Sequence, residues 1–262
     1  MAVHSTAIIS SQAEIAVDAE VGPFSIIKGK TSIGSGTKIE SHTVIGNEHG
    51  ITVIGKKNHI LSGAMVGGIP QDLTYKGEPT RLEIGDGNTI REFVTINNGT
   101  QKGGGLTKIG NNGLFMAYVH IAHDCHIGNN VVIANTTNFA GHVIVEDNVR
   151  IGGVCSFNQF ITIGRFAYIA GESAVNKDIL PFTMVQGMGS YAVSRATNKI
   201  GIERAGFNKE EVANVHRAIR ALIMGNRTIE EALDLISKEC EPSPNIEHLV
   251  NFVRRSERGI AR

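Results

Sequence analysis

The sequence predicts a mainly β fold: a parallel β-helix of hexapeptide repeats, followed by a C-terminal α-helical domain. The first observation is that apolar residues recur every six positions through much of residues 1–189. A period of six fits neither an α-helix nor a simple alternating strand. The second is a change in composition, since residues 1–189 hold 27 of the 31 glycines and residues 190–262 hold four. We therefore expect a β-helix domain over 1–189 and a helical domain over 190–262.

The apolar repeat is expected to form the core of the β-helix. Three hexads, or eighteen residues, make one coil, and each anchor residue should point into a triangular prism. The first run of anchors is Ile9, Ile15, Val21, Ile27, Ile33, Ile39, Ile45 and Ile51. Short runs follow at Ile54, Ile60 and Val66 and at Ile84, Ile90 and Ile96. The longest is Ile109, Phe115, Ile121, Ile127, Ile133, Phe139, Val145, Ile151, Phe157, Ile163, Ile169 and Val175.

Two interruptions of the repeat, at 67–82 and 97–107, are too long for the corners of a prism. They should form loops that leave it, and long ordered loops on a regular scaffold often carry function. After residue 190, capping residues predict three helices, at 208–224, 228–239 and 244–257.

Composition excludes several functional classes. The 262 residues include 25 basic and 25 acidic side chains, so no global charge attracts nucleic acid. No apolar run reaches the roughly 20 residues of a spanning helix, and the N-terminus does not resemble a secretion signal. We therefore expect a cytoplasmic protein that does not span a membrane. The three cysteines are too few and too scattered for a disulfide framework and should be reduced.

Four of the ten histidines lie between residues 120 and 142, and none occupies an anchor position. They should therefore point outward or lie near corners. A spacing of eighteen stacks His123, Gly141 and Gln159 in one column, and Asp124, His142 and Phe160 in the next. This strip resembles an acyl-transfer site, in which His123 acts as a general base, Asp124 orients it, and the Gly141 amide stabilises an oxyanion.

Other interpretations of the histidines remain open. A surface histidine on a β-helix is more often solvated or interfacial than catalytic. His120, His123 and His126 are spaced by three. This spacing also suggests a zinc site between subunits, as in β-helical carbonic anhydrases. Cys125 does not have the surroundings of a nucleophile, because nothing places it in a cleft.

Several strings resemble the UDP-N-acetylglucosamine acyltransferase family of lipid A biosynthesis, within the hexapeptide-repeat acyltransferases. They are VHIAHDCHIGNN (119–130), FAGHVIVED (139–147), IPQDLTYKGEPTRLEIGD (69–86), KGGGLTKIG (102–110) and ERAGF (203–207). The resemblance covers nearly the whole chain. It implies a left-handed β-helix and a homotrimer with clefts between subunits. It also implies transfer of a 3-hydroxyacyl chain from acyl carrier protein to the 3-hydroxyl of UDP-N-acetylglucosamine, without metal or organic cofactor.

The resemblance also assigns residues. The catalytic set it implies is His123, Asp124, Gly141, His120 and His142. The substrate-binding set is Gln71, Asp72, Asn158, Gln159, Gly171, Asn198 and Arg204. Gly171 falls where the family sets acyl-chain length, which predicts a chain of about fourteen carbons because glycine leaves the groove open. Seven arginines could receive the acidic carrier protein or form solvated helix faces: Arg217, Arg220, Arg227, Arg254, Arg255, Arg258 and Arg262.

The chain also departs from the family at five positions. Asn97 and Asn158 stand where well-known members have histidine, Thr74 where they have lysine, Ile200 where they have glutamate and Ala205 where they have arginine. Asparagine cannot carry a proton charge, and loss of lysine and arginine weakens phosphate attraction. An amine acceptor on a 3-amino UDP-sugar, or another sugar nucleotide, is therefore an alternative to the 3-hydroxyl.

Overall fold

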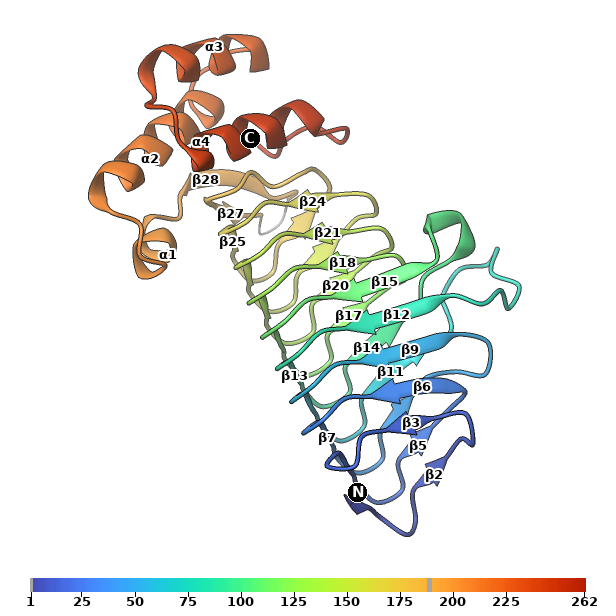
Figure 1. Ribbon diagram of the computed structural model, residues 1–262. Coiled ribbons are helices and arrows are strands. Elements are labelled where there is room, and N and C mark those ends of the chain that lie inside the picture. Colours follow the sequence, from blue (N-terminus) through green and yellow to red (C-terminus); the bar gives the residue numbers. More distant parts are fainter. Residues whose placement is uncertain (1, 188–189) are drawn as a thin grey trace.

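The computed structural model describes residues 2–187 and 190–262. Short strands wind into a three-sided prism that rises from the N-terminus to a cap of helices (Figure 1). Within the described residues the strands form three sheets, one for each face, with 11, 9 and 8 members. Every strand pairing among these described residues is parallel except that of the last two strands of the largest sheet. The predicted parallel β-helix is confirmed.

Sheet A, the largest, continues up to the helical cap. Its strands are β1 (Ala2–Val3), β4 (Glu20–Val21), β7 (Lys38–Ile39), β10 (His59–Ile60), β13 (Thr89–Ile90), β16 (Leu114–Phe115), β19 (Val132–Ile133), β22 (Arg150–Ile151), β25 (Tyr168–Ile169), β27 (Thr183–Gln186) and β28 (Val193–Thr197).

Sheets B and C meet at one corner of the prism. Sheet B contains β2 (Ile8–Ile9), β5 (Ile26–Ile27), β8 (Val44–Ile45), β11 (Met65–Gly68), β14 (Thr95–Asn97), β17 (His120–Ile121), β20 (Asn138–Phe139), β23 (Ser156–Phe157) and β26 (Ala174–Val175). Sheet C contains β3 (Glu14–Ile15), β6 (Lys30–Ile33), β9 (Ile51–Ile54), β12 (Arg81–Ile84), β15 (Leu106–Ile109), β18 (His126–Ile127), β21 (Ile144–Val145) and β24 (Thr162–Ile163). We call the segments that lead from sheet B to sheet C the BC corner.

The anchor residues fill the prism, as the repeat predicts. Partners eighteen residues apart, such as Ile121 and Phe139, lie side by side on neighbouring strands. Phe139 in turn stacks on Phe157 with ring centroids 4.6 Å apart. The anchors from Val21 onward, with one exception, are less than 4 % exposed, whereas Ile9 and Ile15 near the open N-terminal end are only partly buried. The hydrophobic free energy of this column holds the coils together.

The exception is Ile51, for which the prediction of an anchor is wrong. Ile51 is 36 % exposed, and Ile54, which is 2 % exposed, takes the inward position on that coil. The register explains this, because Lys30 pairs with Ile51 and the anchor Ile33 pairs with Ile54. The inward residues Ile45 and Ile54 are therefore nine positions apart, and the six-residue spacing from Ile45 to Ile51 does not mark an anchor.

Both long interruptions leave the prism at the BC corner. Residues 69–80 join β11 to β12, and residues 98–105 join β14 to β15. The two loops project on the same side of the β-helix (Figure 1). The second loop contains a 3₁₀ turn, η1 (Gln101–Gly103). The predicted loops are present, and the strands on either side of them stay in register.

In the part of the chain that the structure describes, four helices form the cap: α1 (Lys199–Arg204), α2 (Lys209–Ile223), α3 (Ile229–Glu239) and α4 (Pro244–Arg255). The last three confirm the predicted helices to within two residues at each end. Their N-caps are Asn208, Thr228 and Ser243, and Thr228 forms a complete capping box with Glu231. The six-residue α1 was not predicted. Among the described residues, no helix combines the length and apolar character needed to cross a membrane.

The helices pack around a second apolar core that includes Leu180 and Phe182 from the end of the coiled region. The antiparallel pair β27 and β28 carries sheet A past residue 190. The expected boundary at 189 falls beside residues 188–189, which lie outside the described residues, and the division there stays a prediction.

Candidate active site

Four of the five predicted catalytic residues lie on consecutive coils of the BC corner, whereas His120 lies on β17 in sheet B. His123 and Asp124 follow β17, Gly141 and His142 follow β20, and Phe160 follows β23. A backbone hydrogen bond of 3.1 Å from His142 N to the His123 carbonyl ties the first two coils together. Asp124 and His142 have positive φ angles of 60° and 63°. The same turn conformation therefore presents both side chains in the same direction.

His123 and Asp124 form the central pair of the site. His123 Nδ1 lies 2.8 Å from Asp124 Oδ2, and their side chains are 8 % and 1 % exposed. Burial alone would raise the pKa of Asp124, but hydrogen bonds from His123 and Thr100 outweigh it and hold the pKa below its ordinary value. An ionised carboxylate only accepts, so His123 Nδ1 donates and Nε2 of the neutral ring keeps its lone pair.

The loop at 98–105 holds this carboxylate in place. Thr100 N donates to Asp124 Oδ1 at 2.8 Å, and Thr100 Oγ1 donates to Oδ2 at 2.6 Å. Gly103 packs directly on the carboxylate, since a Cβ atom there would lie 2.2 Å from Asp124 Cγ. Sequence analysis missed Thr100, although its position in a long loop that precedes the histidine cluster was a usable signal.

Gly141 lies against the imidazole of His123, as the stacking predicts. A Cβ atom on Gly141 would lie 2.6 Å from His123 Cε1 and 2.9 Å from Nε2. Among the described residues, the Gly141 N–H makes no hydrogen bond. The backbone of Gly141 therefore lies against the His123 ring, and only a glycine fits at this position.

His142 is held between two other rings. It meets His123 edge to face, with centroids 5.1 Å apart, and lies parallel to Phe160 at 4.4 Å. Its Nε2 is 3.7 Å from Asp124 Oδ2. Burial lowers the pKa of His142 and outweighs the nearby Asp124 carboxylate, which acts to raise it.

The C-terminal segment reaches this stack of rings. The guanidinium of Arg258 lies over the other ring of the stack, 5.4 Å from the Phe160 centroid, and Nη2 donates to the Gln159 carbonyl at 3.2 Å. Next to it, a cavity of about 480 Å³ is lined by His142 and Phe160 and by Arg255 and Ser256 at the end of α4. The sequence predicted only that Phe160 stacks in one column with Asp124 and His142, and it gave Phe160 no role in the site.

The other two histidines of the cluster, His120 and His126, lie on strands and differ in exposure. His120 is half-buried on β17, and its Nδ1 lies 2.7 Å from Thr95 Oγ1. Burial lowers the pKa of His120, and His123 lowers it further. His126 is exposed on β18, where Nε2 is 3.3 Å from the Leu106 carbonyl. As expected, none of the four points into the prism core.

The first loop brings Asp72 to the same corner. Its carboxylate accepts from Lys102 Nζ at 2.7 Å, and this contact and those from Thr74 hold the pKa of Asp72 far below its ordinary value. Gln71, beside it, is exposed. Asn158 and Gln159 are exposed on the next coil above Gly141. These four predicted substrate-binding residues therefore belong to the corner that carries His123.

Three predicted substrate-binding residues lie elsewhere on the chain. Gly171 follows β25, at the corner between sheets A and B. Asn198 and Arg204 line a cavity of about 720 Å³ between sheet A and α1. Asn198 also caps α1 by accepting from Gly201 N at 3.1 Å. In a single chain, the predicted substrate-binding residues therefore lie in two separate places. One is the BC corner, and the other is the side of sheet A.

The five departures from the family occupy distinct places. Asn97 is buried beside the first loop, where Nδ2 donates to the Ile69 carbonyl at 2.9 Å and Oδ1 finds no donor among the described residues. Asn158 is exposed near the site. Ile200 and Ala205 line the cavity at sheet A, with Ile200 63 % exposed. Thr74 lies beside Lys102, whose Nζ donates to its Oγ1 at 2.8 Å.

The surroundings of Cys125 agree with the expectation that it is not a nucleophile. Burial raises the pKa of the Cys125 thiol to about 12, which leaves it protonated at neutral pH. All three cysteines are free and buried.

The zinc interpretation concerns a different group of side chains. His123, Asp124 and His142 offer side-chain atoms within 4.8 Å of one another. This group differs from the trio His120, His123 and His126 that the spacing of three suggested.

Comparison with known proteins identifies the family. Residues 178–261 match the model of UDP-N-acetylglucosamine O-acyltransferase domain 2, and residues 106–141 match the bacterial transferase hexapeptide model. The UDP-N-acetylglucosamine O-acyltransferase of Moraxella catarrhalis is 40 % identical over 100 % of both chains, with a TM-score of 0.94. The chain belongs to the UDP-N-acetylglucosamine O-acyltransferase family.

Two further solved members of the UDP-N-acetylglucosamine O-acyltransferase family agree with this assignment. LpxA from Acinetobacter baumannii is 41 % identical over 99 % of both chains, with a TM-score of 0.94. The UDP-N-acetylglucosamine acyltransferase of Francisella novicida is 36 % identical, covering 99 % of this chain and 94 % of its own, with a TM-score of 0.95. These matches confirm the left-handed parallel β-helix with a helical C-terminal part.

Proposed function

We propose that this chain transfers a 3-hydroxyacyl group from acyl carrier protein to the 3-hydroxyl of UDP-N-acetylglucosamine, the first step of lipid A biosynthesis. The family assignment supports the acyl transfer and the UDP-sugar acceptor. The observation that carries the mechanism is the pairing of His123 with Asp124 at 2.8 Å, directly against Gly141. Free, buried cysteines fit the reducing cytoplasmic compartment that we include in the proposal.

In the proposed mechanism His123 is the general base. Its Nε2 removes the proton from the acceptor hydroxyl as the oxygen attacks the thioester carbonyl. Asp124 fixes the tautomer and stabilises the imidazolium that forms. The Gly141 N–H binds the tetrahedral oxyanion, a contribution of about 3 kcal/mol for one such donor. When the intermediate collapses, the C–S bond breaks and the departing thiolate takes the proton from His123.

His142 and His120 would support this chemistry as neutral side chains. The pKa of each lies below its ordinary value because burial disfavours the charged form. Neutral rings near His123 do not oppose the imidazolium as two further cations would. They can also donate or accept hydrogen bonds at the sugar.

The proposed assembly is a homotrimer, because one chain does not gather the whole site. Gly171, Asn198 and Arg204 lie at sheet A or its edge, away from the BC corner that carries His123. A second copy that presents sheet A to this corner would complete a cleft between subunits. Head-to-tail contacts of this kind close into a ring. In that cleft Arg204 would meet the pyrophosphate and Gly171 would face the acyl chain of about fourteen carbons.

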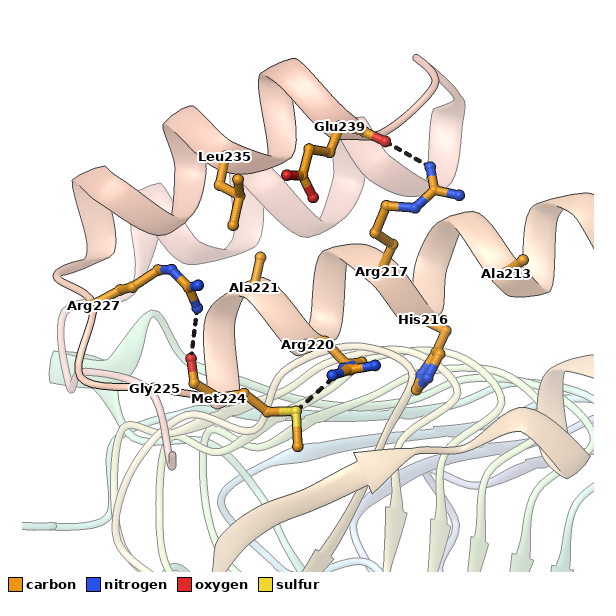
Figure 2. A pocket seen from close by; sticks show the side chains of 10 residues that line it. All are labelled: Ala213, His216, Arg217, Arg220, Ala221, Met224, Gly225, Arg227, Leu235 and Glu239. Atoms are coloured by element: carbon orange, nitrogen blue, oxygen red, sulfur yellow. Dashed lines mark hydrogen bonds between the residues drawn. The ribbon is translucent and has the colours of Figure 1, made fainter.

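The acyl carrier protein is proposed to dock on the helical cap. Arg217, Arg220 and Arg227 line a cavity of about 610 Å³ between α2 and α3 (Figure 2). Arg217 donates to the Glu239 carbonyl at 2.6 Å and Arg227 to the Met224 carbonyl at 2.9 Å, so both are held at the rim. Of the other four arginines, Arg254 is exposed on α4, Arg255 and Arg258 contact the β-helix, and Arg262 donates to the Leu222 carbonyl. An acidic surface would find its main partners at the cavity.

Mass spectrometry of the products tests the proposal. Full-length protein is incubated with 3-hydroxyacyl carrier proteins of several chain lengths and with UDP-N-acetylglucosamine or its 3-amino analogue. We expect an ester of the 3-hydroxyl and the highest turnover with about fourteen carbons. An amide formed only with the analogue would identify the amine acceptor instead. Absence of both products would refute the proposal.

The variant His123→Ala tests the general base. We expect turnover to fall about 10²- to 10⁴-fold while the trimer stays folded. The matched control is His126→Ala, because His126 is exposed and lies outside the proposed machinery. Near-normal turnover in His123→Ala would refute the base assignment.

A further inference from the structure

The two loops of the BC corner are joined by one lysine. Lys102, in the middle of η1, reaches the loop at 69–80, where Nζ lies 2.7 Å from Asp72 Oδ2 and 2.8 Å from Thr74 Oγ1. Asp72 Oδ1 in turn accepts from Thr74 N and Oγ1, both at 2.8 Å. The ammonium is therefore held in one position although it projects from a loop.

Lys102 is also coupled closely to the reacting groups. Its neighbour Gly103 packs on the Asp124 carboxylate, and Thr100, the N-cap of the same turn, donates two hydrogen bonds to it. The turn that orients His123 through Asp124 thus also carries the ammonium. The ammonium is also near enough to the histidines that its charge adds to the effect of burial in lowering the pKa of His142.

Exposure shows which member of the ion pair faces a ligand. The Lys102 side chain is 56 % exposed, whereas the Asp72 side chain is 10 % exposed. An ammonium has three N–H donors, and hydrogen bonds to Asp72 and Thr74 use two of them. One donor remains on the open side of the pair. Without Lys102, a phosphate at this place would instead meet the Asp72 carboxylate.

We propose that Lys102 is a binding residue for the diphosphate of the acceptor nucleotide. This inference rests on the proposed function. A cation at this corner suits a phosphate oxygen, because charge-assisted hydrogen bonds are the strongest available to such a group. Position 74 holds threonine rather than the lysine of well-known family members. The ammonium of Lys102 donates a hydrogen bond to the Oγ1 atom of this threonine. The loop at 98–105 therefore supplies the charge that the loop at 69–80 lacks.

The test is an exchange of the lysine between the two loops in the full-length enzyme. We expect Lys102→Gln to raise the KM for UDP-N-acetylglucosamine about tenfold to hundredfold, with kcat changed by less than about threefold. Adding Thr74→Lys to Lys102→Gln should bring the KM back to within about threefold of the original. Lys108→Gln, an equal change of charge on the exposed side of β15, is the matched control and should leave KM unchanged.

A second measurement separates ligand binding from a loop clamp. UDP and uridine are used as competitive inhibitors of the original enzyme and of Lys102→Gln. We expect weaker inhibition by UDP and unchanged inhibition by uridine, because only UDP carries the diphosphate. An unchanged KM, equal weakening of both inhibitors, or no recovery in the folded double variant would overturn the inference.

Failure of the proposed function would be visible separately. If the original enzyme makes no acylated product, calorimetric binding of UDP to it and to Lys102→Gln still tests the lysine. A Kd that rises about tenfold or more in the variant supports Lys102 as a phosphate ligand. Equal Kd values refute it.

Discussion

Thr100 holds the carboxylate of Asp124 through both of its oxygens: Thr100 N donates to Oδ1 at 2.8 Å and Thr100 Oγ1 to Oδ2 at 2.6 Å. Because Oδ2 also accepts from His123 Nδ1, one loop residue determines how the carboxylate meets the imidazole. Thr100 therefore acts as a positioning residue for the proposed base.

The variant Thr100→Val keeps the shape of the side chain and removes its hydroxyl donor. We expect kcat to fall about tenfold and the folded protein to lose about 1–3 kcal/mol, because a buried carboxylate oxygen loses a partner. Steady-state kinetics and urea unfolding measure the two effects. Thr100→Ser retains the hydroxyl and should behave like the original protein. Equal losses in both variants would contradict the role of the hydroxyl.

The stack of Phe160 on His142 gives a second prediction. Phe160→Leu removes both the parallel ring at 4.4 Å and the surface under Arg258. We expect a loss of about 1 kcal/mol in unfolding free energy and a several-fold fall in kcat, because the His142 ring loses its fixed orientation. Phe160→Tyr keeps the aromatic face and is the control. If leucine and tyrosine gave the same kcat, the stack would have no role in catalysis.

Stability should fall as the pH is lowered through the range of histidine. The pKa of His120 lies below its ordinary value of 6.5 because burial, and then His123, disfavours the charged ring. Below about pH 6.5 the unfolded chain therefore binds more protons than the folded chain, and the free energy of unfolding decreases. Urea unfolding at about pH 7.5 and 5.5 measures this decrease.

The variant His120→Asn removes one of the titrating groups, so its loss of stability between these two pH values should be smaller. An equal loss in the variant and in the original protein would show that His120 does not contribute. His142, whose pKa is also lowered by burial, is expected to account for part of the remaining pH dependence.

The zinc hydratase interpretation predicts a metal requirement that the proposed acyl transfer lacks. Both oxygens of Asp124 already accept hydrogen bonds from Thr100 or His123. We expect dialysis against a chelator to leave acyl transfer unchanged. Stoichiometric zinc in the purified protein, together with activity lost on chelation and recovered with zinc, would favour the hydratase instead. Metal analysis and the acyl-transfer assay together decide this.

Sequence periodicity predicted most of the prism because each inward position requires an apolar residue of suitable size. It failed at Ile51, where three extra residues moved the anchor to Ile54 and an isoleucine happened to fall on the old period. Helix caps predicted α2, α3 and α4. The short α1 escaped because six residues that include Gly201 show no apolar periodicity.

The site was predictable where it depends on the eighteen-residue coil. The columns of His123 with Gly141 and of His142 with Phe160 follow directly from stacking. The contacts of Thr100 and Lys102 could not be predicted in this way, because they depend on the path of loops that have no repeat. The place of Arg204 could not be predicted from the coil spacing either, because Arg204 lies on α1, outside the eighteen-residue coils.

The strands beside both loops pair as though the loops were absent: Ile54 pairs with Ile84, and Ile84 with Ile109. The loop at 69–80 can thus gain or lose residues at its tip without moving His123 relative to Gly141, whereas the loop at 98–105 is tied to Asp124 by Thr100 and Gly103. Contacts that the loop at 69–80 makes with a nucleotide are consequently separable in evolution from the acyl-transfer step. Paralogues can acquire new acceptors by changes in that one loop, provided that the loop at 98–105 keeps its hold on Asp124.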